Sequence, residues 1–219
     1  MSNAPLTRLI FDSLWKNNPA LVQLLGLCPL LAVSTSTVNA LSLASATLFV
    51  LLVSNASILL IRNVIPDTIR LPITILLISA AVSMTELLMQ AHRYQLYKTL
   101  GIFLPLITVN GIILIQADAA ARKNAPLAVL YHGLIIGVGF GAALVLLGAI
   151  RELLGTGALF TDMHLLFGAG TETWRWQVLK VDHPLLVATL PPGAFLVTGC
   201  LIALKNQIDT NIERRSKLG

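Results

Sequence analysis

Two stretches of the chain, LGLCPLLAVSTSTVNA at residues 25–40 and LGIFLPLITVNGIILI at residues 100–115, resemble one another and decide the fold. Both carry Leu-Gly, then two or three apolar residues, then Pro-Leu, and both later contain Thr-Val-Asn followed by a small residue, although the spacing between these elements differs. Glycine and proline disfavour the interior of a helix. Each stretch therefore predicts a helix that is broken within an apolar segment.

The composition around these stretches is that of a membrane protein. The 219 residues are 56% hydrophobic and only 11% charged, with a mean hydropathy of +0.82. A membrane-spanning helix needs about 20 mostly apolar residues. Six apolar segments occur, the first of them short, at 20–33, 38–61, 71–89, 100–117, 127–154 and 184–204. We therefore predict an all-α, polytopic fold with six transmembrane helices, two of them proline-broken half-helix segments.

The two broken segments lie three helices apart, so they must cross the membrane in opposite directions. This arrangement is typical of an inverted-topology repeat, in which broken helices meet near the midplane of the membrane. Backbone groups freed from helical hydrogen bonds are tolerated at that depth only where they line a protected site. The pattern therefore predicts a site formed by both stretches, and Cys28 lies on the first.

The segments also predict the domain organisation and the orientation. We predict an amphipathic helix at residues 1–19, which lack the continuous apolar run of a signal peptide. The six-helix membrane domain is predicted at 20–206, with an external loop at about 155–183, and a basic tail at 207–219. In this arrangement ten of the 15 Lys and Arg residues lie on the side of the termini. Positive charge marks the cytoplasmic side, so both termini are predicted there, and the net charge of +5 needs no nucleic-acid partner.

Two cysteines, Cys28 and Cys200, both lie in apolar runs and are too few for a disulfide framework. A cysteine in such a run is commonly a small apolar side chain. The alternative is a thiolate ligand, and iron–sulfur clusters are usually held by four thiolates. One chain with two distant cysteines cannot supply four, so a cluster at Cys28 would have to be shared between subunits.

Charged residues in the apolar segments suggest two further roles. Glu86 is the most interior acidic residue, where a charge must be paired, hydrated or protonated. It is a candidate for an ion pathway, with solvation at the membrane interface as the alternative. Arg151 and Glu152 end the fifth segment and are interpreted as membrane boundary residues.

Three glycines in the fifth segment, Gly133, Gly137 and Gly141, are four residues apart. They leave one smooth helix face that another helix can approach closely. The same region contains GVGFGA, a formal match to a dinucleotide-binding motif, but no strand precedes it. Helix packing is therefore the predicted role of these glycines.

Four stretches carry a specific resemblance to a known family: LVQLLGLCPLLAV at 21–33, LYKTLGIFLPLITVN at 96–110, LGAIRELLGTGALF at 147–160 and HPLLVATLPPGAF at 183–195. Together they resemble the E subunit of the Rnf electron-transport complex, which is related to the D subunit of the sodium-translocating NADH:quinone reductase. The resemblance extends over about residues 21–204, nearly the whole membrane part.

The resemblance implies a six-helix subunit paired with a homologous A subunit of opposite topology, with one [2Fe–2S] cluster shared between them at mid-membrane. Each partner in the family normally provides two cysteines. Cys28 matches the first, but the second should follow Asn110 directly, and this chain has Gly111 there. Because glycine cannot ligate iron, three outcomes stay open: no cluster, a cluster with a substitute ligand, or a cluster in an altered site. Asn110 is a candidate lining residue of this site.

The family resemblance further implies a redox-driven ion translocase of the ferredoxin:NAD oxidoreductase type, in the inner membrane of a bacterium and in contact with lipid. This chain would relay electrons without a flavin or a catalytic residue of its own, coupled to Na⁺ or H⁺ movement, beside the A, B, C, D and G subunits. Two alternatives stay open. The first is a small-solute or ion transporter, and the second is a purely structural subunit of the same complex that has lost cluster ligation.

Overall fold

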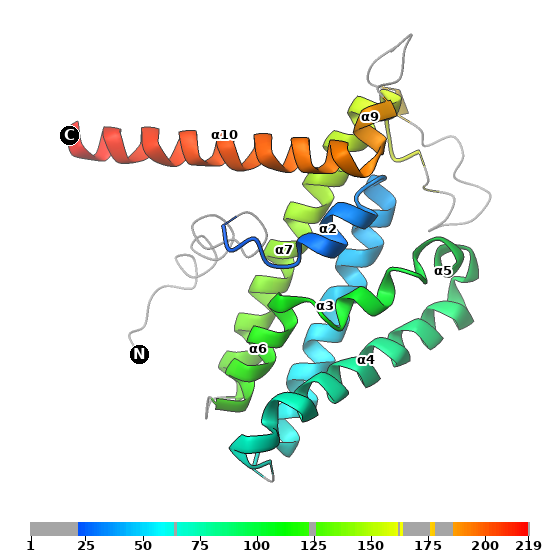
Figure 1. Cartoon of the computed structure of the whole chain (residues 1–219), viewed down its shortest axis with the longest axis vertical. Helices are drawn as coiled ribbons and strands as arrows, with labels where there is room; N and C mark the ends of the chain where they lie inside the picture. The colour runs from blue at the N-terminus through cyan, green and yellow to red at the C-terminus, as the bar shows by residue number, and fades with distance from the viewer. Residues whose placement is uncertain are drawn as a thin grey trace.

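The structure, a computed structural model, describes residues 22–63, 65–122, 126–161, 163, 176–177 and 186–218. The helix predicted at 1–19 and most of the loop predicted at 155–183 lie outside these residues. Within them the regular elements are helices, joined by turns and irregular residues, and two strands of two residues each, β1 (Ala158–Leu159) and β2 (Trp176–Gln177), which pair antiparallel (Figure 1). The all-α prediction is confirmed for the described part of the chain.

In the part of the chain that the structure describes, three helices are long and apolar enough to cross a membrane: α3 (Thr37–Ile61), α4 (Arg70–His92) and α7 (Pro126–Thr156). The most apolar window of each has a mean hydropathy of 2.1, 1.9 and 2.4, respectively. They correspond to the second, third and fifth predicted segments. A short 3₁₀ turn, η2 (Asp67–Ile69), precedes α4. The other three segments are broken, so six complete spans remain a prediction.

The glycines of α7 let it pack directly against α3. A Cβ atom on Gly137 would lie 2.6 Å from Leu48 Cδ1, and one on Gly141 would lie 3.2 Å from the Ala44 Cβ atom. Farther along, a Cβ atom on Gly148 would lie 2.8 Å from the Ala40 Cβ atom. The contacts therefore proceed antiparallel along the two helices, and the packing role predicted for the glycine face is confirmed.

The first predicted segment forms only the seven-residue helix α2 (Leu27–Val33). The helix starts directly after Gly26, whose φ of 73° is left-handed and favours glycine, and Leu24 before it also has a positive φ of 54°. A proline in an apolar run predicts an interruption of the helix, but Pro29 lies in the first turn of α2. That part of the prediction is wrong, because the first backbone N–H groups of a helix have no helical acceptor and a proline there removes no hydrogen bond.

The fourth predicted segment is not one continuous helix. The helix α5 (Tyr94–Leu100) ends where the segment begins, and the 3₁₀ turn η3 (Leu104–Ile107), which begins with the Leu-Pro pair, and α6 (Gly111–Arg122) follow. Figure 1 shows this chain passing from the end of α4 back to α6. The helix α6 begins directly after Asn110, whose Oδ1 atom accepts a hydrogen bond from the backbone N–H of Ile112 at 3.1 Å. Asn110 therefore caps α6 in the usual manner of an N-cap residue.

The sixth predicted segment contains α9 (Leu186–Thr189) and α10 (Pro191–Leu218). The chain bends at Leu190, immediately before two prolines, where a helical conformation is disfavoured. Figure 1 shows α10 running away from α7. Residues of the predicted basic tail up to Leu218 continue this helix, and their cytoplasmic location stays a prediction.

Candidate functional site

The structure brings the two similar stretches into contact at the ends of their broken helices. A Cβ atom on Gly26, the residue before α2, would lie 2.8 Å from Asn110 Oδ1, and one on Gly111 would lie 3.3 Å from Leu25 Cδ2. The N-terminal ends of α2 and α6 therefore meet, and we call the contact of residues 25–26 with residues 110–111 the half-helix junction. A side chain at Gly26 would both collide with Asn110 and strain the backbone.

Asn110 is an interior residue of the half-helix junction, with 2% of its surface exposed. Its Oδ1 atom caps α6, but its Nδ2 atom has no hydrogen-bond partner in the described part of the chain. Buried polar atoms in proteins are nearly always paired. The amide N–H groups of Asn110 are therefore available to an acceptor at this junction, as expected for a residue that lines a site.

Cys28 lies in the first turn of α2, two residues from Gly26, and its side chain is exposed. Its thiol is thus on the surface of this chain, beside the half-helix junction, where a partner subunit can reach it. Cys200 is also exposed but belongs to α10. Among the described residues, no group of three His, Cys, Asp or Glu side chains is close enough to hold a metal ion.

Gly111 is where the family resemblance implies a second thiolate, and here it provides no side chain. The adjoining space is filled by Leu25, whose atoms lie 3.3 to 3.9 Å from a Cβ atom built on Gly111. A [2Fe–2S] cluster usually takes four thiolates. The described residues suit one ligand position, through Cys28, and leave the second without a donor, so they do not complete a four-thiolate set.

Glu86 is half-buried on α4, and its Oε1 atom accepts a hydrogen bond from the Tyr97 hydroxyl at 3.1 Å. This bond joins α4 to α5. The structure therefore pairs Glu86 with a phenol rather than with Cys28 or Asn110. Its role in an ion pathway stays a prediction.

Arg151 is fully buried inside the end of α7. Its Nη1 atom donates to Ser34 Oγ at 2.8 Å, and its Nε and Nη2 atoms donate to the carbonyls of Ala188 at 3.0 Å and Leu190 at 3.2 Å. The helix α7 continues past Arg151, and α2 and α9 cover this turn, while a position of Arg151 at the membrane boundary stays a prediction. Arg151 thereby ties the end of α2 to the bend between α9 and α10.

Glu152 is also buried, with 2% of its surface exposed. Its Oε2 atom accepts from the backbone N–H of Thr37 at 2.8 Å and from the Thr37 hydroxyl, and its Oε1 atom accepts from the N–H of Thr161 at 2.7 Å. A carboxylate at a helix N-terminus is favoured by the helix dipole. The pair therefore fixes the ends of α2 and α3 relative to α7. The sequence offered one signal for these buried contacts, an Arg-Glu pair inside a predicted helix that is longer than a membrane span requires.

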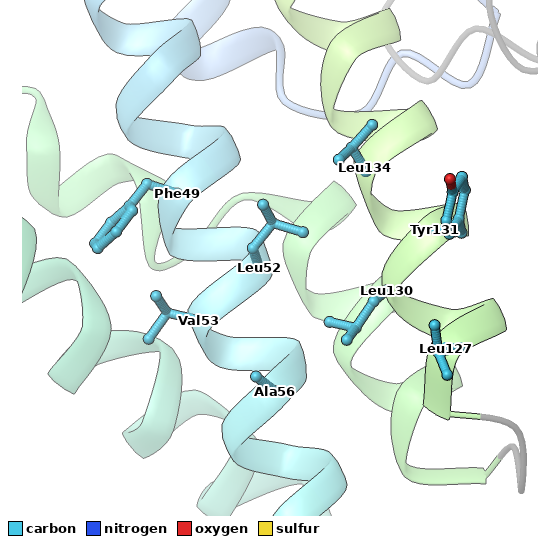
Figure 2. A pocket seen from close by; sticks show the side chains of 8 residues that line it. All are labelled: Phe49, Leu52, Val53, Ala56, Leu127, Leu130, Tyr131 and Leu134. Carbon is cyan, nitrogen blue, oxygen red and sulfur yellow. The ribbon is translucent and has the colours of Figure 1, made fainter.

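An apolar groove lies between α3 and α7 on the outside of the bundle, and Figure 2 shows the side chains that line it. Its lining is entirely hydrophobic except for one tyrosine hydroxyl. The groove suits a lipid chain or a neighbouring apolar helix and offers no ligand chemistry. It is lined by Phe49, Leu52, Val53, Ala56, Leu127, Leu130, Tyr131 and Leu134.

Comparison with known proteins identifies the family. A family model described as "Rnf-Nqr subunit, membrane protein" matches residues 6–202. A protein from Cellvibrio japonicus (strain Ueda107), named as the E subunit of an ion-translocating oxidoreductase complex, is 52% identical over 217 residues, covering 99% of this chain and 91% of its own. A protein of the same name from Vibrio vulnificus (strain YJ016) is 50% identical over 95% of this chain and 90% of its own length. Another, from Pseudoalteromonas atlantica (strain T6c / ATCC BAA-1087), is 51% identical over 94% of this chain and 89% of its own length. The chain therefore belongs to the Rnf-Nqr family of membrane protein subunits, as its half-helix stretches predicted.

Proposed function

We propose that this chain is the E subunit of an Rnf-type ferredoxin:NAD oxidoreductase complex, which couples electron transfer to the movement of Na⁺ or H⁺ across a bacterial inner membrane. The proposal is supported by the family of the chain and by relatives, about 50% identical in sequence, that are named as E subunits of ion-translocating oxidoreductase complexes. The observation that carries the proposal is the half-helix junction beside the exposed thiol of Cys28. The excess of Lys and Arg on one side supports two cytoplasmic termini.

In this proposal Cys28 is the single ligand that the chain contributes to a redox centre shared with the homologous A subunit of opposite topology. A [2Fe–2S] cluster, when bound, would supply one-electron transfer. Cys28 can present its thiolate from the surface, while Gly111 and Leu25 leave no second donor on this side. A shared centre would therefore need a ligand from outside the usual four thiolates.

The half-helix junction also supports a coupling role. The first amide groups of α6 point toward its N-terminus and favour negative charge there. Charges interact more strongly in a medium of low dielectric constant than in water. Negative charge that arrives near Cys28 would therefore alter the energy of the contact between α2 and α6, and a rearrangement of these half-helices would move the coupled ion.

Ion transport and electron transfer measured together test this role. We would reconstitute the intact complex in liposomes and compare Cys28→Ser with Cys200→Ser, its matched control on α10. The proposal expects Cys28→Ser to assemble but to lose ferredoxin:NAD electron transfer and ion uptake, while Cys200→Ser retains both. Full activity of Cys28→Ser would contradict the relay role.

Gly111, which cannot ligate iron, favours a second candidate function, that of a structural subunit without a redox role. This candidate expects the complex to require the chain for assembly while neither cysteine matters for electron transfer. The same pair of variants separates the two functions. Ion uptake by the isolated chain without any redox partner would instead support a transporter.

A further inference from the structure

Asn55 is a fully buried polar residue of α3 for which the structure shows no partner. It is 0% exposed, and neither Oδ1 nor Nδ2 has a hydrogen-bond partner among the residues that the structure describes. An amide buried without partners costs free energy, more so where lipid rather than water surrounds the protein. The amide of Asn55 therefore indicates that a polar ligand belongs beside it.

Two other helices bring polar side chains to the same region. A Cβ atom on Gly133 of α7 would lie 2.7 Å from Asn55 Nδ2, so this glycine leaves the room that the amide occupies. The preceding residue, His132, is half-buried, and its Nδ1 atom lies 3.4 Å from Oε1 of Gln116 on α6. Gln116 is itself buried, with 6% of its surface exposed. Asn55, Gln116 and His132 thus come from α3, α6 and α7.

In the described parts of α3, α6 and α7, the residues directly before and after these three positions carry no charge. The next buried residues along the three helices include Ile58, Val129 and Ala117, none of them more than 2% exposed. Asp118, the nearest carboxylate along α6, forms a salt bridge with Arg122 at 2.9 Å, outside this interior. The cluster therefore offers neutral amide oxygens without a negative charge.

We propose that Asn55, Gln116 and His132 form a binding site for a monovalent alkali cation, with Na⁺ as its ligand. The inference rests on the proposed function, because it places a site for the transported ion within this chain. Hard cations prefer oxygen ligands, which the amides of Asn55 and Gln116 supply. The Nδ2 atom of Asn55 then donates to a water molecule of the cation's shell, which gives both ends of the amide a partner.

The chemistry of the site favours weak binding of an ion with a single positive charge. Oxygen dipoles without a carboxylate can replace part of the hydration shell of a monovalent ion, as backbone carbonyls do in ion channels. An ion that is to cross the membrane must also leave its site, so weak binding is suitable. Asn55 lies six residues before Ile61, which places it about 9 Å from that end of α3. The proposed orientation makes this the cytoplasmic end.

Direct binding of Na⁺ tests the site without requiring electron transfer. We would measure binding of radioactive Na⁺ to the intact, detergent-purified complex by equilibrium dialysis, for wild type, Asn55→Leu and Asn39→Leu. Asn39 is a matched control, because it is a buried asparagine with an unpartnered Oδ1 atom near the opposite end of the same helix. We expect Asn55→Leu to weaken binding at least about tenfold, the effect of losing one charge-assisted contact, and Asn39→Leu to leave it unchanged.

A second variant covers the case in which Asn55→Leu does not assemble. Gln116→Met removes the oxygen ligand from α6 and keeps a side chain of similar length, and it should weaken Na⁺ binding in the same way. Equal Na⁺ binding by wild type and either assembled variant would overturn the site. Ion uptake that depends on pH but not on Na⁺ would also overturn it, in favour of a proton.

Electron transfer separates failure of this site from failure of the proposed function. Asn55→Leu should need at least about tenfold more Na⁺ for half-maximal ion uptake and, because the two processes are coupled, for half-maximal electron transfer. If Cys28→Ser retains full activity while Na⁺ binding depends on Asn55, the relay role fails and the cation site stands. If Cys28→Ser is inactive and Asn55→Leu binds Na⁺ normally, the cation site alone fails.

Discussion

Gly26 and Asn110, which lie in different halves of the chain, are in contact so close that a methyl group on Gly26 would lie 2.8 Å from the Asn110 Oδ1 atom. This contact joins the N-terminal ends of α2 and α6 and places the thiol of Cys28 beside the half-helix junction. The packing of the two half-helices and the redox role proposed for the chain therefore depend on the same few residues.

Replacing Gly26 should damage the half-helix junction. We expect Gly26→Ala to destabilise the complex by about 1–3 kcal/mol, because its φ of 73° strains a residue with a Cβ atom and that atom collides with Asn110. Thermal unfolding of the purified complex measures this loss. Gly199→Ala is the control, since nothing lies within 4 Å of its new Cβ atom. Equal melting temperatures for the two variants would refute the proposed contact.

Replacing Arg151 should loosen the end of α2. Arg151→Lys keeps the charge but cannot reproduce the fork of hydrogen bonds to Ser34, Ala188 and Leu190. We expect the free energy of unfolding to fall by about 2 kcal/mol, because buried acceptors lose their donor, and denaturant unfolding measures this change. The control, Arg122→Lys, alters an exposed salt bridge and should change stability by less than about 0.5 kcal/mol. A similar effect of both variants would argue against the buried arrangement.

The glycines of α7 should differ in their tolerance of a methyl group. In Gly148→Ala the new Cβ atom would lie 2.8 Å from the Ala40 Cβ atom and 3.2 Å from the backbone oxygen of Ser36, neither of which can move easily. In Gly141→Ala the nearest atom is the Ala44 Cβ atom at 3.2 Å. We expect Gly148→Ala to cost about 1–3 kcal/mol and Gly141→Ala to cost less. The reverse order of melting temperatures would show that α3 and α7 pack differently.

Gly111→Cys should restore the missing thiolate. Its Cβ atom would lie 3.3 Å from Leu25 Cδ2, so the flexible leucine side chain must shift by a few tenths of an ångström. We therefore expect the variant to fold and to bind more iron and acid-labile sulfide per complex than wild type. Chemical analysis of both elements measures the change, with Gly111→Ser as a control of similar size. Equal iron content in all three proteins would mean that this position does not face the shared centre.

Periodicity and length predicted the parts of the fold in which a helix is continuous. The second, third and fifth apolar segments form α3, α4 and α7, and the spacing of Gly133, Gly137 and Gly141 predicted the face that meets α3. Local chemistry located the broken segments but not the break points. In the first of them the helix starts directly after Gly26 and includes Pro29, and only the backbone conformation shows which residue lies outside the helix.

The interior ionic and polar contacts could not be predicted, because they depend on residues more than a hundred positions apart. Glu152 caps α3 through Thr37, and Arg151 reaches Ser34, yet both charged residues follow an apolar segment as boundary residues do. Asn55 likewise gave no signal in the sequence, since a single asparagine in an apolar helix is distinguished only by its buried, unpartnered amide. The two similar stretches, in contrast, did predict that the regions of Cys28 and Asn110 belong to one site.

The proposal that Cys28 ligates a redox centre shared with a partner is tested most directly by electron paramagnetic resonance of the reduced, intact complex. Spectra of wild type, Cys28→Ser and Cys200→Ser should be recorded at equal concentrations of assembled complex. The account predicts a [2Fe–2S] signal in wild type and Cys200→Ser that is lost or changes its g values in Cys28→Ser. An identical signal in all three proteins, or none in wild type, would contradict it.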